Sequence, residues 1–112
     1  MPLVANEKAR LFDTAAQTAD TDVLPSEMTP SESPAAFVVT VQVASAATVK
    51  VAETVSGTTK SYVLNDGTQL GAGELYTFEV PVRDAGSYNI RLGSGVAIDV
   101  LNVDEIPLEA KQ

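Results

Sequence analysis

The segment Phe37–Val43, FVVTVQV, decides the fold class because its apolar and polar residues alternate along the chain. Successive side chains of a β-strand point to opposite faces of the sheet, so this period of two predicts a strand with one buried face. The face expected in the core holds Phe37, Val39, Val41 and Val43. The opposite face holds Val38, Thr40 and Gln42.

Similar alternation returns along the rest of the chain, which predicts further strands at 48–55, 61–64, 75–82, 87–92 and 96–103. Turn residues separate these segments: SGTT at 56–59, RDAG at 83–86 and GSG at 93–95. Short strands with a turn about every ten residues are typical of antiparallel sandwiches and barrels. We therefore expect an all-β fold, an antiparallel, jelly-roll-like β-sandwich of about six to eight strands.

Two of the predicted strands have unusual features. Pro81 lacks a backbone N–H, so it is expected at the edge of a sheet or at a bulge. The segment 96–103, VAIDVLNV, is apolar on both faces, and we expect it to pack against the core and a neighbouring molecule together.

The first 34 residues differ in character from the remainder, because they are rich in Ala, Thr, Ser, Asp and Pro. Prolines at 25, 30 and 34 favour extended backbone. We interpret 1–34 as an extended N-terminal arm and 35–112 as the β-sandwich domain with a short C-terminal tail. The apolar residues expected to attach the arm to the domain or to a partner are Leu11, Phe12, Val23, Leu24 and Met28.

The composition restricts the partners and the chemistry of the chain. Its 112 residues fit one small domain. With 7 Lys and Arg against 15 Asp and Glu, the formal net charge is −8, which disfavours binding to nucleic-acid phosphates or an anionic membrane surface. There is no Cys and no His, which excludes disulfides, thiolate nucleophiles and Ser-His-Asp triads.

The first residues, MPLVANEKARLFD, lack the basic start and continuous apolar core of a signal peptide. No apolar run approaches the ~20 residues that a membrane span requires. We expect the protein to be made in the cytoplasm and to stay soluble unless it assembles. We expect no catalytic activity, cofactor, metal or small-molecule substrate.

The segment 63–80, VLNDGTQLGAGELYTFEV, has a polar centre with two possible interpretations. Asn-Asp-Gly at 65–67 and Gly-Ala-Gly at 71–73 favour positive φ and tight turns. Alternatively, Asn65, Asp66 and Glu74 supply oxygen ligands for a cation. Calcium requires six to eight oxygens, and this loop lacks the EF-hand spacing, so the turn interpretation is preferred.

Five further carboxylates are candidates for chemistry or docking. Glu53, Glu79 and Asp99 suggest paired-acid hydrolysis, which needs two acids about 5 to 9.5 Å apart. We expect all three on outward strand positions, where they form a solvated face. Asp104 and Glu105 either close the last strand as polar residues or form an acidic patch for a basic partner.

Two longer stretches together resemble small virion structural proteins of tailed bacteriophages. These are TADTDVLPSEMTPSESPAAFVVTVQV at 18–43 and VLNDGTQLGAGELYTFEVPVRDAGSYNIRLGSGVAIDVLNVDEI at 63–106. Such proteins commonly combine an entry with TD, TP and SP pairs, a central LN-x-G and LY-x-F-x-V-x-V pattern, and a closing V-x-E-I. The resemblance covers roughly 18–106, and it departs from the pattern at RDAGSYN, where a Gly-Asp-Ser turn is expected.

The resemblance implies a head decoration or cement protein on the outer capsid surface of the virion. Its partners would be the major capsid protein and copies of itself, as a homotrimer. The alternative is a tail, neck or whisker module that binds host glycans. That alternative predicts sugar contacts from an exposed Tyr62 or from residues 65–68.

Overall fold

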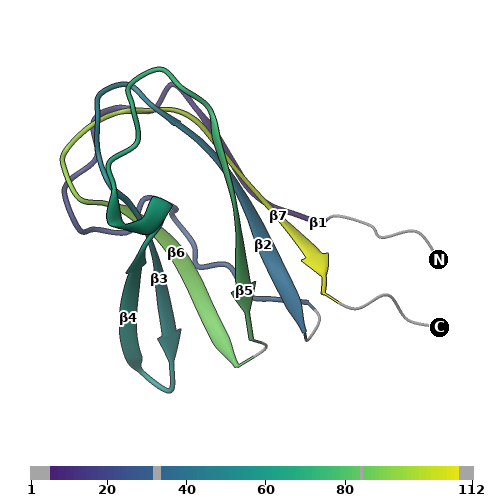
Figure 1. Ribbon diagram of the computed structural model, residues 1–112. Helices are drawn as coiled ribbons and strands as arrows, with labels where there is room; N and C mark the ends of the chain where they lie inside the picture. The colour runs from purple at the N-terminus through teal and green to yellow at the C-terminus, as the bar shows by residue number, and fades with distance from the viewer. Residues whose placement is uncertain (1–5, 32–33, 84, 109–112) are drawn as a thin grey trace.

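The computed structural model describes residues 6–31, 34–83 and 85–108 and contains seven strands in two antiparallel sheets (Figure 1). One sheet has the order β1-β7-β2-β5 and the other β4-β3-β6, which confirms the predicted β-sandwich. The strands are β1 (Asn6–Phe12), β2 (Ala35–Val43), β3 (Val49–Val55), β4 (Thr58–Val63), β5 (Tyr76–Val82), β6 (Gly86–Leu92) and β7 (Ile98–Pro107).

Strand β2 lies inside its sheet, between β7 and β5. Its alternating face is buried as predicted, with Phe37, Val39, Val41 and Val43 at most 1% exposed. The opposing sheet contributes β3 and β6 residues, and the Phe37 ring meets the Tyr88 ring edge-on with centroids 5.4 Å apart. Full burial of each large apolar side chain stabilises the fold by about 1.5–3 kcal/mol.

The turns follow the predicted residue chemistry. Ser56 and Gly57 have φ values of 52° and 81° and join β3 to β4 as a two-residue hairpin turn. Such turns need positive φ at both central residues. Asn65, Asp66 and Gly67 also have positive φ and form a short 3-10 turn (η1, Asn65–Gly67). The 65–67 segment is therefore a turn, as preferred from the sequence.

Pro81 lies on β5, the edge strand of its sheet, as predicted. In 96–103, strict alternation would place Ile98 and Leu101 on opposite faces, and the structure departs from it. Gln42 pairs with Val100 and Val43 with Ile98, so Asp99 is the extra residue of a β-bulge. The bulge shifts the alternation by one residue, and both Ile98 and Leu101 are fully buried in the chain's own core.

The segment interpreted as an extended arm is bonded to strands of both sheets. Residues 6–12 form β1, which pairs with β7. The chain then crosses to the open edge of β6, where the backbone of Asp20, Val23 and Met28 bonds to that of β6 at 2.7–2.8 Å. These contacts cover the β6 edge. The segments 1–34 and 35–112 therefore pack together along this edge.

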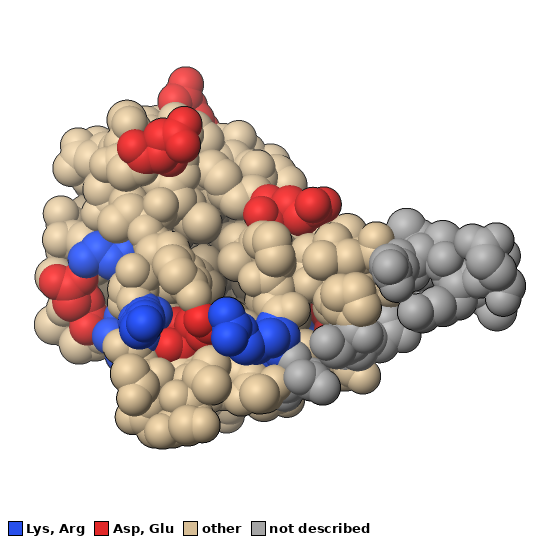
Figure 2. Space-filling view, turned by 60° about the horizontal axis from the view of Figure 1, so that its bottom comes forward, with Lys and Arg blue, Asp and Glu red and all other residues tan. Residues whose placement is uncertain are grey.

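Ion pairs reinforce this attachment. Asp20 accepts from Lys50 of β3 at 2.5 Å, and Asp22 accepts from Arg91 of β6 at 2.8 Å. Figure 2 shows Lys and Arg side chains next to Asp and Glu side chains on one face of the molecule. Since these pairs are partly exposed, each contributes at most about 1 kcal/mol.

Candidate functional site

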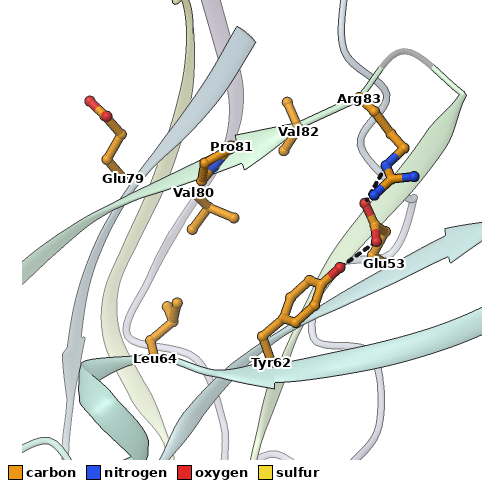
Figure 3. A pocket seen from close by; sticks show the side chains of 8 residues that line it. All are labelled: Glu53, Tyr62, Leu64, Glu79, Val80, Pro81, Val82 and Arg83. Carbon is orange, nitrogen blue, oxygen red and sulfur yellow. Dashed lines mark hydrogen bonds and ion pairs between the residues drawn. The ribbon is translucent and has the colours of Figure 1, made fainter. Parts of the chain in front are cut away.

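A pocket of about 510 Å³ opens between β4, the edge of one sheet, and β5, the edge of the other (Figure 3). Ligand sites commonly have volumes of about 300–1,000 Å³. The apolar lining comes from Leu64, Val80, Pro81 and Val82. The polar lining comes from Glu53, Tyr62, Glu79 and Arg83.

Glu53 is the centre of the polar lining. The Tyr62 hydroxyl donates to its Oε1, and the Tyr88 hydroxyl donates to its Oε2 at 2.6 Å. The Arg83 Nε lies 3.4 Å from the same Oε2. Figure 3 shows Tyr62, from β4, and Arg83, which follows the end of β5, directed toward Glu53, while Glu79 points away. The Glu53 residue is 8% exposed, so these donors replace most of its water.

The contacts displace the pKa values of all three groups. Hydrogen bonds from Tyr62 and then Tyr88 hold the pKa of Glu53 below its ordinary value, despite the opposing effect of burial. Burial, followed by the hydrogen bond to Glu53, raises the pKa of Tyr88 to about 12. The hydrogen bond to Glu53 is also the largest cause of the raised pKa of Tyr62. At neutral pH the site is an ionised carboxylate between neutral phenols.

This arrangement is better suited to joining strands by hydrogen bonds than to transferring protons. A general base accepts a proton most effectively when its pKa lies near the working pH, and the pKa of Glu53 is shifted in the opposite direction. The Tyr88 hydroxyl also accepts the Arg83 backbone N–H at 2.8 Å. The cluster thus joins β3, β4 and β6 to the end of β5.

The expectation that Glu53 lies on a solvated face is wrong. Glu53 occupies the same alternating positions as Val49, Val51 and Val55, so its inward direction was readable from the sequence. The tyrosine donors were not, because they come from other strands. Glu79 is exposed, and Asp99 lies in the β7 bulge.

A second buried carboxylate, Glu105 of β7, is 1% exposed. Both of its oxygens accept the Ser31 backbone N–H, at 2.9 and 2.8 Å, and Lys8 Nζ lies 3.0 Å from Oε1. Lys8 is the extra residue of a bulge in β1. Glu105 is thus neither a solvated strand end nor part of a surface acidic patch; it joins two parts of the 1–34 segment to β7.

The five predicted partner-binding residues lie in different environments. Leu24 and Met28 are 5% and 4% exposed and belong to the core. Leu11 and Val23 are partly buried against that core. Phe12 is 61% exposed, so it is the member of the set available to a partner in this conformation.

Two of the three residues considered for a cation site, Asn65 and Glu74, make hydrogen bonds within their own loops. The Asn65 side chain donates to the Thr68 carbonyl at 3.5 Å, and Glu74 accepts from the Tyr76 hydroxyl at 2.9 Å. Within 6–31, 34–83 and 85–108, no group of three or more acidic side chains is placed to hold a metal ion. Tyr62 is 43% exposed, in agreement with its predicted exposure.

In comparisons with known proteins, no protein-family model and no curated protein sequence matches the chain. In the part of the chain that the structure describes, no helix has the length and apolarity needed to cross a membrane.

Proposed function

We propose that the chain is a structural protein of a tailed-phage virion that binds the outer surface of the capsid shell and stabilises it. The major capsid protein is the main partner in this proposal, and copies of the chain are the second, as the homotrimer that the resemblance implies. The pattern at 18–43 and 63–106 supports the virion assignment. Catalysis and cofactors are not part of the proposal.

The observation that supports a structural role is that both buried carboxylates bind donors within the protein itself. Glu53 and Glu105 are each held by several donors from separate segments of the chain. Both therefore serve to hold the sandwich together, which leaves recognition to the outer surface. The surface suits a basic partner, since the chain has a formal net charge of −8.

Phe12 is the residue we assign to the shell contact. It is 61% exposed on β1, one of the two edge strands of the four-stranded sheet. A large exposed aromatic residue is a frequent anchor in protein interfaces. Removing the first 34 residues would not test this contact, because the deletion also removes β1 and the buried Leu24 and Met28.

Co-sedimentation with empty capsids of the encoding phage tests the proposal. Saturable binding at a fixed ratio to the capsid subunit is expected for the wild type, and its absence would refute a decoration role. Phe12→Ser is expected to weaken binding at least tenfold, whereas Leu75→Ser is the matched control because Leu75 is also 61% exposed. Equal binding by the two variants would refute the Phe12 assignment alone.

A second candidate function is glycan binding by a tail, neck or whisker component. The observation that favours it is the exposed Tyr62 ring, which lines the 510 Å³ pocket together with Arg83. A glycan array tests this function. Tyr62→Phe keeps the ring and should retain sugar binding, while Tyr62→Ala should lose it; no hits for the wild type would refute it.

A further inference from the structure

The three sheet edges formed by β1, β5 and β6 have features that hinder further pairing. The segment containing Asp20, Val23 and Met28 covers β6. Pro81 removes a donor from β5, and the bulge at Lys8 distorts β1. Prolines, bulges and covering segments are common means of keeping strand edges from pairing with other chains.

The edge of β4 differs, because this strand is regular and exposed at all six positions. The two-residue turn makes Val55 and Thr58 a hydrogen-bonded pair, and the pattern continues to the bond from Leu64 N–H to the Val49 carbonyl at 2.8 Å. Since bonded and non-bonded pairs alternate, the backbone groups of three β4 residues point away from β3. These are Thr59, Ser61 and Val63.

We propose that the β4 edge binds the β4 edge of a second copy of this chain, antiparallel about a twofold axis at Ser61. Two antiparallel registers allow five residues of one β4 strand to pair with five of the other. In the first, residue 60 lies opposite residue 60 of the other copy, and in the second, residue 61 lies opposite residue 61. The first opposes Lys60 to Lys60, which like-charge repulsion disfavours. The second opposes Lys60 to Tyr62 of the other copy and Thr59 to its Val63.

The side chains fit this second register. Of the cations in 6–31, 34–83 and 85–108, Lys60 is the one without a carboxylate oxygen within 4.0 Å. Opposite Tyr62 it gains a cation–aromatic contact beside the Glu53 carboxylate. Tyr62 and Val63, 43% and 40% exposed, become covered in the same pairing.

The pairing is independent of capsid binding. An edge strand pairs once, so β4 joins two copies, and the threefold assembly implied by the resemblance requires another surface. Each copy carries a formal charge of −8, so the association should strengthen as added salt screens their repulsion.

Single cysteines test the register directly, because the chain has none of its own. Residues opposed as a hydrogen-bonded pair have Cα atoms about 5.5 Å apart, which a disulfide can bridge. Under mild oxidation Ser61→Cys should form dimers at least tenfold faster than Leu75→Cys, an exposed control. Thr59→Cys and Val63→Cys should cross-link when mixed and remain largely unlinked when separate.

Sedimentation of the oxidant-free protein provides the second measurement. The wild type should contain an even number of copies, and Ser61→Pro, which removes an outward N–H, should halve that number. The proposal is overturned if Ser61→Cys cross-links no faster than Leu75→Cys, if Thr59→Cys pairs with Ser61→Cys instead, or if the wild type is monomeric at every concentration and salt level.

Discussion

The Asn89 side chain binds the backbone of Leu24 through both of its polar atoms. Oδ1 accepts the Leu24 N–H at 2.9 Å, and Nδ2 donates to the Leu24 carbonyl at 3.1 Å. The same Oδ1 accepts the Ile90 N–H at 2.8 Å. Asn89 is 2% exposed, so these bonds lie in the interior. They satisfy the Leu24 backbone groups, which would otherwise need a neighbouring strand as partner.

Replacing Asn89 with Ala should reduce the free energy of unfolding by about 2–3 kcal/mol, because the buried Leu24 N–H and carbonyl lose their partner. Urea denaturation measures this loss. Amide hydrogen exchange should quicken across residues 20–28 before it quickens in β2. Asn102→Ala, at a half-buried position of β7, is the control, with a loss below about 1 kcal/mol. Equal losses for the two variants would contradict the assignment.

Glu53→Gln should destabilise the protein by about 1.5–3 kcal/mol at neutral pH, because a charged acceptor of two tyrosine hydroxyls is lost. Since the folded pKa of Glu53 is lowered from 4.5, ionisation stabilises the fold above that pH. The advantage of the wild type should shrink as pH falls through the folded pKa. Urea midpoints from about pH 7 to about pH 3 measure this trend.

The exposed carboxylate on β5 provides a control for the charge change itself. Glu79→Gln should alter stability by less than about 0.5 kcal/mol at neutral pH. A difference between wild type and Glu53→Gln that stays constant with pH would show that the Glu53 charge does not stabilise the fold.

Tyr88→Phe should alter the alkaline stability profile. The pKa of Tyr88 is raised from 10.0 to about 12, so the folded state retains a proton that the unfolded state loses. Stability from this group is complete below pH 10 and is lost as pH rises to about 12. The variant should decline less steeply over that interval, as measured by urea midpoints; an equally steep decline would contradict the inference.

Glu105→Ala should destabilise the protein by about 3 kcal/mol, because it leaves Lys8 and the Ser31 N–H without this carboxylate. Thermal unfolding measures the effect, and proteolysis should cut earlier between residues 12 and 31. Glu7→Ala breaks an exposed pair with Arg10 and should cost less than about 1 kcal/mol. Similar melting temperatures for the two variants would refute the role given to Glu105.

The local parts of the fold could be predicted because they depend on neighbouring residues. The alternation from Phe37 to Val43, the turn at Ser56 and Gly57, and the edge position of Pro81 each follow from backbone geometry. The bulge at Asp99 could not be predicted, because it appears only when β7 is paired with β2.

The candidate site was predicted less well for a similar reason. The exposure of Tyr62 was anticipated, whereas Glu53 was misplaced on the solvated face. Its direction was present in the period of β3, but its stability in the interior depends on donors from β4, β5 and β6. The sequence does not show which distant donors will converge on a carboxylate.

The all-β class, most strand positions, the turns and the acidic charge follow from the amino-acid sequence alone. Only folding showed that residues 6–28 bond to strands of both sheets, that donors from distant segments hold Glu53 and Glu105 in the interior, and that β4 keeps an open edge. The physical reason is range: alternation and turn propensity act between adjacent residues, whereas burial and edge pairing depend on segments that meet only after folding.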